Sequence, residues 1–139
     1  VHTPEQRSHN MARIRSKDTK PELLLRRELW KTGMRYRLQF NLPGKPDLTF
    51  TKQRLVIFID GCFWHKCPEH FVMPKTRTGF WKEKIEKNVI RDARVNRELS
   101  ELGWYVIRVW EHEVRADVKG LSERIQAILT QRKKSNFIR

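Results

Sequence analysis

A short segment in the middle of the chain gathers residues that can bind a soft metal ion. Both cysteines, Cys62 and Cys67, lie in it together with His70, and His112 follows much later in the chain. Two thiolates and two imidazoles form a common tetrahedral ligand set for zinc and leave no coordination position open for a substrate. The pattern therefore predicts a structural zinc ion that ties a loop to the end of a later strand. The alternative is two buried free cysteines beside surface histidines.

Two aspartates close to this segment are candidates for binding a harder cation. Asp47 follows Pro46 at the start of a predicted strand, and Asp60 comes just after the next predicted strand. Neighbouring strand ends can hold two carboxylates on one Mg²⁺, which would activate water and stabilise a leaving oxygen. Without a cation, two close carboxylates repel each other and one pKa rises. From local chemistry alone, Asp47 is explained equally well as a turn residue that accepts backbone hydrogen bonds.

Four further polar residues are weaker candidates for chemistry. His65 is left over once zinc is assigned, and a neutral imidazole there could take a proton from an attacking water; it could also contact a phosphate or be a further zinc ligand. Glu22 has a strong alternative as the N3 member of a helix capping box. Asn88 and Asp92 stand one helical turn apart, so they share a face that either reaches the site or lies in a solvated stripe.

The charge of the chain predicts a polyanionic partner. Thirty lysines and arginines stand against 16 acidic residues, which gives a net charge of +14. Such an excess favours nucleic acid over the alternative of a generic solubilising surface. The sequence shows no signal peptide, no run long enough to span a membrane and no long amphipathic helix typical of membrane surfaces. We therefore expect a cytoplasmic, nucleoid-associated protein that does not bind membranes and keeps its cysteines reduced for metal.

Capping signals and hydrophobic periodicity predict the elements that position these residues. Thr19 begins a helix that Gly33 ends, and Gly103 ends a long helix with Val89, Ala93, Leu99 and Leu102 inward. The predicted helices cover residues 3–14, 19–32, 80–102 and 117–128, and the predicted strands cover residues 35–40, 47–50, 55–59 and 104–110. We interpret the whole chain, residues 1–139, as one α/β domain in which helices flank a mixed sheet.

Several ordered motifs together resemble the very-short-patch mismatch repair endonuclease family. The resemblance extends over roughly residues 3–114, and this number of blocks at compatible spacing is highly specific. The motifs that carry it are Asn10-Met11-x2-Ile14, Thr19-x-Pro21-Glu22, Leu42-Pro43-Gly44-Lys45-Pro46-Asp47, Gly61-Cys62-Phe63-Trp64-His65, Phe80-Trp81-x2-Lys84-Ile85-x2-Asn88-x2-Arg91-Asp92, Leu102-Gly103-Trp104 and Val109-Trp110-Glu111.

This resemblance implies a restriction-endonuclease-like fold with an added structural zinc site. It implies a Mg²⁺-dependent endonuclease that recognises T:G mismatches left by deamination of 5-methylcytosine. Such an enzyme nicks double-stranded DNA on the 5′ side of the mispaired thymine and so initiates very short patch repair. A single asymmetric mismatch requires only a monomer, and a mismatch-repair matchmaker protein is a further expected partner.

The resemblance also implies roles for individual residues. Asp47 matches the main metal carboxylate and His65 the general base, while Asp92, Asn88 and Glu22 support the metal waters or the base. The zinc positions match Cys62, Cys67, His70 and His112. The aromatic residues that wedge into DNA match Phe63, Trp64 and Trp81, although Phe63 and Trp64 have an alternative as core residues under the zinc. Met11 and Ile14 match a DNA-contacting N-terminal arm, residues 1–18, that precedes a catalytic core, residues 19–139.

One departure from the family pattern lies beside the metal site. Familiar members carry Thr-His where this chain has Ile59-Asp60. The main-chain carbonyl of Ile59 can still bind Mg²⁺, and Asp60 makes the site more like that of restriction nucleases with two carboxylates. Two other functions therefore stay open. A restriction-type or structure-selective nuclease would cut other DNA, including matched duplex, whereas a catalytically inactive, zinc-stabilised DNA-binding module would bind DNA without Mg²⁺-dependent cleavage.

Overall fold

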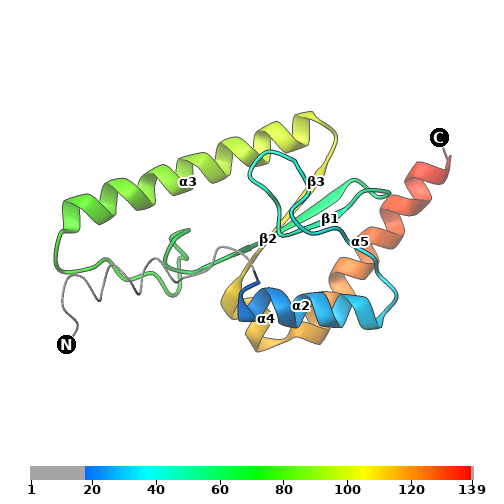
Figure 1. Cartoon of the computed structure of the whole chain (residues 1–139), viewed down its shortest axis with the longest axis horizontal. Coiled ribbons are helices and arrows are strands. Elements are labelled where there is room, and N and C mark those ends of the chain that lie inside the picture. The colour runs from blue at the N-terminus through cyan, green and yellow to red at the C-terminus, as the bar shows by residue number, and fades with distance from the viewer. Residues whose placement is uncertain (1–17, 139) are drawn as a thin grey trace.

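The computed structural model of the chain describes residues 18–138, and its side chains through residue 133 (Figure 1). The predicted helix over residues 3–14, with Met11 and Ile14, lies outside this described part. In chain order the elements are α2 (Lys20–Lys31), β1 (Leu48–Phe50), β2 (Leu55–Asp60), α3 (Thr78–Glu101), β3 (Tyr105–Trp110), α4 (Glu111–Ala116) and α5 (Val118–Ile138).

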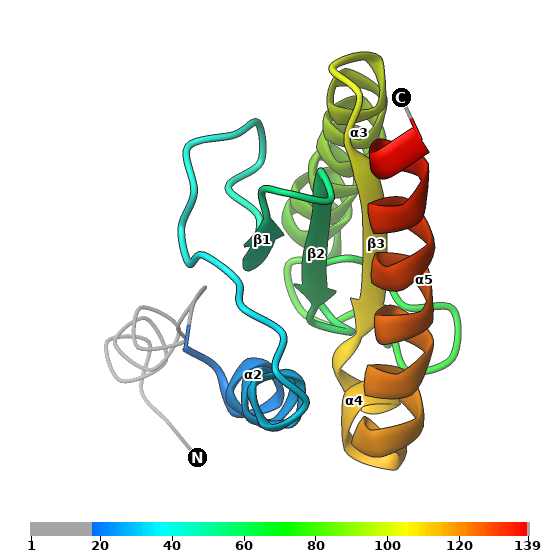
Figure 2. The same cartoon turned by 90° about the vertical axis from the view of Figure 1, so that its right-hand side faces the viewer.

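The strands form the mixed sheet that the sequence predicts. Their order is β1-β2-β3, with β2 antiparallel to β1 and parallel to β3. The register places Phe58 opposite Arg108 and Asp60 opposite Trp110. Figure 2 shows α3 behind the strands and α5 in front of them, so helices flank the sheet as expected. The α/β class is thereby confirmed, while a complete restriction-endonuclease-like fold stays a prediction.

The central strand β2 is buried on both faces because its side chains enter two different cores. Leu55 and Ile57 pack with residues of α2, α4 and α5, whereas Val56 and Phe58 pack with residues of α3. Successive side chains of a strand point to opposite faces, so an uninterrupted apolar run is what a doubly covered strand requires. This run therefore anchors the strand end that carries Asp60.

The predicted helix boundaries are confirmed where local capping signals are strong. Thr19 is the N-cap of α2 and accepts a hydrogen bond from the backbone N–H of Glu22 at 3.4 Å. Gly33 and Gly103 follow the ends of α2 and α3 with φ of 88° and 91°, in the left-handed region where glycine is not strained. The Thr19 cap thus fixes the start of the helix that presents Glu22.

The prediction of a strand over residues 35–40 is wrong. This segment makes only an isolated bridge between Arg37 and Thr49. Gln39 has a φ of 52°, which breaks the extended conformation that alternating residues would need. The segment with alternating polar and apolar residues is therefore a partly exposed loop and not a strand.

The inward face of α3 also differs from the prediction. Val89, Ala93 and Leu102 are exposed, whereas Leu99 is buried as expected, together with Ile85 and Val95. The buried residues Ile85, Val95 and Leu99 and the half-buried Asn88 and Asp92 share one helical face, so the covered face carries polar residues in its middle. A hydrophobic pattern alone misplaces such a face, and this placement turns Asn88 and Asp92 towards the sheet.

The C-terminal region contains two helices where one was predicted. The first, α4, follows β3 directly, and the Glu113 side chain accepts a hydrogen bond from the Trp110 backbone N–H at 2.9 Å. The second, α5, begins at Val118 after Asp117 as expected but continues well past residue 128. Among the helices of the described residues, none combines the length and the apolar character needed to cross a membrane.

Candidate active site and candidate metal centre

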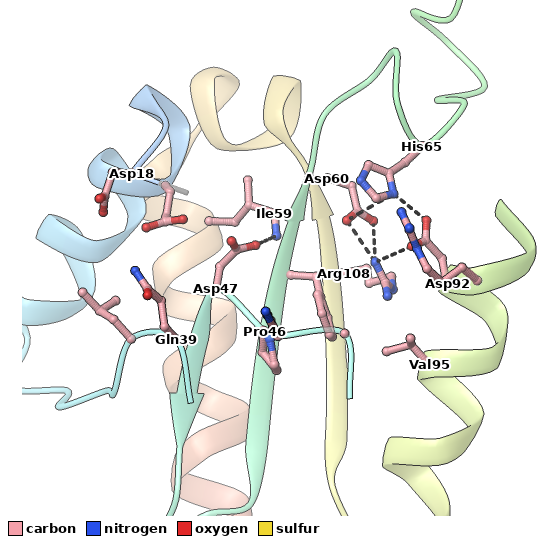
Figure 3. A pocket seen from close by; sticks show the side chains of 16 residues that line it. Asp18, Gln39, Pro46, Asp47, Ile59, Asp60, His65, Asp92, Val95 and Arg108 are labelled. Carbon is pink, nitrogen blue, oxygen red and sulfur yellow. Dashed lines mark hydrogen bonds and ion pairs between the residues drawn. The ribbon is translucent and has the colours of Figure 1, made fainter. Parts of the chain in front are cut away.

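A cleft of about 600 Å³ opens at the end of β2, between α2 and α3 (Figure 3). Among the residues predicted for catalysis, Glu22, Asp47, Asp60, His65 and Asp92 line this cleft, as does Ile59. Asn88 is not among the lining residues. The fold therefore brings together acids that are far apart in the sequence, because α2, β2 and α3 all reach the same end of the sheet.

Asp47 lies half-buried just before β1, beside the end of β2. Its Oδ2 accepts a hydrogen bond from the backbone N–H of Ile59 at 2.7 Å. Burial, with a smaller contribution from the neighbouring Glu22 carboxylate, raises the pKa of Asp47 to about 7 against the lowering effect of the Ile59 N–H. A buried carboxylate next to a second one is electrostatically unfavourable, and a divalent cation would remove that repulsion.

Glu22 is buried and faces the cleft from the first turn of α2. Its Oε2 accepts a hydrogen bond from Nη1 of Arg26 at 3.0 Å, and the same nitrogen donates to Oδ1 of Asp18 at 2.7 Å. The side chain is therefore engaged by an arginine one helical turn away, whereas the Thr19 cap uses only the backbone N–H of Glu22. This arrangement favours the predicted role in the cleft over the capping-box alternative.

Asp60 ends β2 and is paired with Arg108 on the adjacent strand. Nη1 of Arg108 donates to both carboxylate oxygens of Asp60, at 3.0 and 3.1 Å. Burial raises the pKa of Asp60, while His65 and Arg108 oppose that increase. Asp60 was predicted to share one cation with Asp47, but the structure already gives Asp60 a cation from the chain itself.

His65 and Asp92 form a hydrogen-bonded pair on the α3 side of the cleft (Figure 3). Nδ1 of His65 lies 2.5 Å from Oδ2 of Asp92 and 3.8 Å from Oδ1 of Asp60. Although burial lowers the pKa of His65, the bond to Asp92 and the charge of Asp60 outweigh it, so the pKa is raised overall. A carboxylate acceptor fixes the proton on Nδ1, which leaves Nε2 as the ring nitrogen for proton exchange with a substrate.

Asn88 occupies a different position from the one expected of a group that supports metal waters. Its Nδ2 donates to the carbonyl of Trp64 at 3.1 Å, and its Oδ1 accepts from Arg91 at 2.9 Å. Both ends of the amide are therefore used. Because Trp64 directly precedes His65, Asn88 holds the backbone of the loop that presents the imidazole.

Sequence reasoning missed the arginines that neutralise the acids of this cleft. Arg26 contacts Asp18 and Glu22, and Arg108 contacts Asp60 and, at 3.7 Å, Asp92. One signal was present, since Arg108 interrupts an otherwise apolar strand in which every neighbour favours burial. A charge at such a position requires a partner in the interior.

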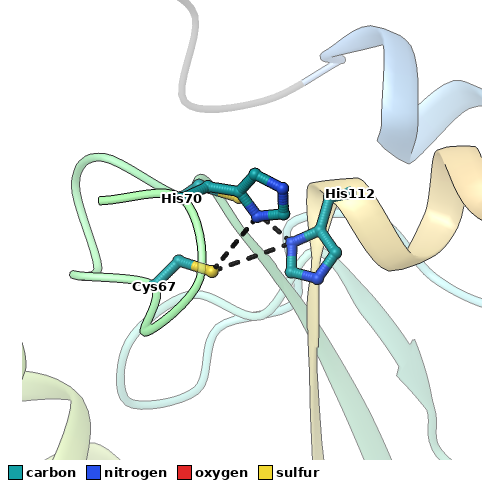
Figure 4. A group of neighbouring side chains, drawn as sticks. Cys67, His70 and His112 are labelled. Carbon is teal, nitrogen blue, oxygen red and sulfur yellow. Dashed lines mark hydrogen bonds between the residues drawn. The ribbon is translucent and has the colours of Figure 1, made fainter. Parts of the chain in front are cut away.

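The predicted zinc ligands form a compact group, of which Figure 4 shows Cys67, His70 and His112. Ligand atoms of Cys62, Cys67, His70 and His112 all lie within 4.8 Å of one another. The sulfur of Cys62 lies 3.4 Å from Nδ1 of His112, and the sulfur of Cys67 lies 3.8 Å from Nδ1 of His70 and 3.7 Å from Nδ1 of His112. The loop after β2 and the start of α4 thus meet at this group.

These separations fit a tetrahedral zinc ion. Ligand atoms at the corners of a tetrahedron lie about 1.6 bond lengths apart, so Zn–S bonds of about 2.3 Å and Zn–N bonds of about 2.0–2.1 Å give separations of about 3.3–3.8 Å. The other ring nitrogen of His112, Nε2, lies 3.7 Å from a carboxylate oxygen of Glu69. Carboxylates commonly orient metal-binding histidines in this way, so the donor set fits zinc well.

An aromatic cluster lies next to the metal-ligand group. Phe63, Trp64 and Trp81 contact one another with ring centroids 5.2 to 6.0 Å apart. All three side chains are half-buried, and none belongs to either hydrophobic core of the described residues. Exposed Phe80 extends the cluster, and the Lys84 ammonium lies 5.7 Å from the Trp64 ring. This position argues against core residues and fits a surface that contacts a stacked, negatively charged ligand.

Comparison with known proteins identifies the class to which this fold and site belong. Residues 1–71 match the family described as DNA mismatch endonuclease Vsr. The chain is 45% identical to DNA mismatch endonuclease Vsr of Escherichia coli over 132 residues, which cover 91% of this chain and 85% of the relative.

Relatives described as nicking enzymes are equally similar. The chain is 48% identical to the type II nicking enzyme V.NaeI of Lentzea aerocolonigenes over 117 residues, which cover 80% of this chain and 70% of the relative. It is 45% identical to the type II nicking enzyme V.NmeAIP of Neisseria meningitidis, with 83% of this chain and 84% of the relative covered. The chain therefore belongs to the family of the DNA mismatch endonuclease Vsr, as the sequence motifs indicated.

Proposed function

We propose that this protein is a Mg²⁺-dependent endonuclease that nicks double-stranded DNA on the 5′ side of the mispaired thymine in a T:G mismatch and so initiates very short patch repair. Membership of a family whose relatives are described as a mismatch endonuclease and as nicking enzymes supports cleavage of DNA. The observation that carries the proposal is Asp47, a half-buried carboxylate beside the buried Glu22 at the end of a sheet, in a chain with a net charge of +14.

Asp47 is the carboxylate we assign to the catalytic cation. Among the acids that line the described cleft, it is the one with no arginine or histidine partner within the described residues. The Ile59 N–H fixes one of its oxygens, Ile59 and Glu22 line the cleft beside it, and we expect the main-chain carbonyl of Ile59 and the Glu22 carboxylate to be further oxygen ligands. When bound there, Mg²⁺ would supply activation of a water and stabilisation of the leaving oxygen.

His65 is the residue we assign to proton transfer. Its Nδ1–H donates to Asp92, so the ring has a fixed orientation and Nε2 is the nitrogen that can accept the proton of an attacking water. Asn88 supports this arrangement through the Trp64 carbonyl. Asp92 acts by orienting the ring, in the same way that a buried carboxylate orients a catalytic histidine in hydrolases.

Recognition of the mismatch is the role we assign to the aromatic cluster. A mispaired step is the least costly place to unstack a duplex, so inserted rings distinguish it from matched DNA. Phe63, Trp64 and Trp81 supply rings at the surface, and Lys84 supplies charge for nearby phosphates. We expect Met11 and Ile14 of the N-terminal arm to approach the DNA as well.

Zinc is the ion we assign to Cys62, Cys67, His70 and His112, in a structural role. The four ligands close the coordination sphere, so the ion has no position for a substrate. Its effect is to hold the loop that carries His65 and the aromatic rings against the start of α4. The expectation of a monomer and of a matchmaker partner is part of the same proposal.

The function is tested with a duplex that carries one T:G mismatch and a different dye on each strand. We expect one Mg²⁺-dependent nick on the 5′ side of the mispaired thymine, and none in a matched duplex or when Mg²⁺ is omitted. Flanking base pairs are varied in parallel to find the preferred context. Cleavage of matched duplex would support the restriction-type alternative, and tight binding without a cut would support the inactive DNA-binding module.

A further inference from the structure

Arg108 is held in a half-buried position on β3 by contacts from two other elements, β2 and α3. It stands in the middle of β3 on the face covered by α3, and its side chain is 18% exposed. Nε donates to Oδ1 of Asn96 on α3 at 2.6 Å, while Nη1 reaches both oxygens of Asp60 on β2. The guanidinium also stacks on the Phe58 ring, 4.1 Å from its centroid. These contacts fix the group in one orientation.

The guanidinium lies where a metal ion would otherwise satisfy the nearby acids. Asp60, His65 and Asp92 offer ligand atoms that all lie within 4.8 Å of one another. Nη1 of Arg108 is 3.0 Å from one oxygen of Asp60 and 3.7 Å from Oδ1 of Asp92. A single positive nitrogen therefore faces both carboxylates, in the position of a cation that they share (Figure 3).

The other side of the cleft has no such internal cation in the described part of the chain. Asp47 accepts the neutral N–H of Ile59 and faces the carboxyl group of Glu22, which is contacted by Arg26 on the side of α2. The cleft thus contains one acidic group whose charge is balanced by the fold and one whose charge is not. A divalent cation binds most favourably to carboxylate oxygens that no guanidinium already contacts.

We propose that Arg108 is a positioning residue that takes the place of a metal ion at Asp60 and Asp92, and so confines the catalytic cation to Asp47. The inference rests on the proposed function for its catalytic consequence. By holding Asp60 and Asp92, Arg108 keeps the carboxylate that orients His65 in place without a second metal ion. Asp60, Asp92 and Arg108 then form one structural unit across β2, α3 and β3.

The inference is tested first by counting Mn²⁺ bound to the full-length, zinc-loaded protein with electron paramagnetic resonance. Arg108→Met keeps a long side chain on Phe58 but removes the charge, and Arg108→Gln removes the charge while keeping a hydrogen-bond donor. We expect each to bind about one more Mn²⁺ per chain than the wild type, because the two carboxylates then need a cation. Zinc content and cooperative thermal unfolding show which variants are folded. A folded Arg108→Met or a folded Arg108→Gln is sufficient to decide the test.

Three matched variants show whether the additional Mn²⁺ binds where expected. The double variant Asp60→Asn/Arg108→Met should lose the additional ion, and Arg108→Lys should not gain it. Arg124→Met removes an exposed arginine from α5, on the other side of the sheet, and should bind Mn²⁺ as the wild type does. No gain in Arg108→Met or Arg108→Gln, or a gain that survives loss of Asp60, would overturn the inference.

Single-turnover nicking of the T:G duplex then tests the positioning role. We expect Arg108→Met to nick about 10-fold or more slowly at unchanged DNA affinity, and Arg108→Lys to recover most of that rate. A rate close to that of the wild type, or a loss of rate explained by weaker DNA binding, would contradict a positioning role. Failure of the wild-type protein to nick would refute the proposed function, whereas the Mn²⁺ count would still decide the position of the cation.

Discussion

Asp47 and Asp60 come from neighbouring strands and line the same cleft, yet only Asp60 has an arginine partner among the described residues. Nη1 of Arg108 donates to both oxygens of Asp60, whereas Asp47 accepts from a backbone N–H and stands beside Glu22. The fold thus neutralises one buried acid and leaves the other to be neutralised from solution. The difference supports our proposal that Asp60 serves structure and that Asp47 binds the cation.

The strongest test of this comparison removes the side chain without an internal partner. We expect Asp47→Ala to lower the nicking rate by about 10³-fold or more while DNA binding survives, because the cation loses its main ligand. Single-turnover nicking and fluorescence anisotropy with the T:G duplex measure the two properties. Glu123→Ala, an exposed acid on α5, is the matched control. Turnover close to wild type in Asp47→Ala would refute the assignment.

A second test concerns the proposed zinc ligands, which, like Asp47, would be completed by an ion from solution. We expect Cys67→Ala and Cys62→Ala to lose zinc and to lower the free energy of unfolding by about 3 kcal/mol or more, since structural zinc contributes several times that in small peptides. Atomic absorption and chemical denaturation measure the two effects. Full zinc content in both variants would show that these sulfurs are not ligands.

A third test uses the pKa of Asp47 in protein without Mg²⁺. The folded-state pKa is about 7 against an ordinary value of 3.8, so the folded protein holds a proton that the unfolded chain releases between these values. Stability therefore falls as pH rises from about 4 to about 7, and the penalty is complete above that range. We expect Asp47→Asn to raise the free energy of unfolding by about 1–3 kcal/mol at pH 8 and much less at pH 4.

Denaturation with urea at the two pH values measures this effect. Asp60→Asn gives the contrast. Although burial raises the pKa of Asp60 as well, this substitution removes the carboxylate that Arg108 contacts through both oxygens, and we expect the loss of that ion pair to destabilise the protein at pH 8. If both substitutions had the same sign, the two acids would not differ as the structure indicates.

The smallest expected effect comes from the cap that positions Glu22. Thr19→Ala removes the side chain that accepts from the Glu22 N–H, and we expect it to cost about 0.5–1 kcal/mol of stability. Thr19→Ser, which keeps the hydroxyl, should behave as the wild type. Thermal unfolding detects this difference, and an equal loss in both variants would rule out the capping bond as the cause.

Local signals were enough to predict much of the fold. The Thr19 cap, the turn glycines Gly33 and Gly103 and the apolar run in β2 each act within a few residues, so the sequence contains the information directly. The strand prediction for residues 35–40 was wrong because polar and apolar residues can also alternate in a loop. The left-handed backbone at Gln39, which distinguishes this loop from a strand, is not evident from the sequence. The inward face of α3 was misplaced because its middle carries Asn88 and Asp92 rather than apolar residues.

The sequence was enough to predict which acids, histidines and cysteines belong to the candidate site, but not which arginines contact the acids. Motif order pointed to Asp47, His65 and the cysteine and histidine group, which the structure does place at one end of the sheet. The partners Arg26 and Arg108 could not be assigned in the same way, because lysines and arginines are abundant throughout the chain. Which of them meets an acid depends on the register of β2 against β3 and on the rotation of α3.

The backbone bond from the Cys67 N–H to the Cys62 carbonyl, 2.8 Å long, closes a short loop that contains His65. The proton transfer that we propose for His65 and the zinc site that we propose therefore share one segment of the chain, and removal of zinc would also release the imidazole. A strong chelator such as EDTA would then stop nicking by two routes at once. Omission of Mg²⁺ from zinc-loaded protein, followed by its restoration, separates a reversible requirement of the chemistry from damage to the loop.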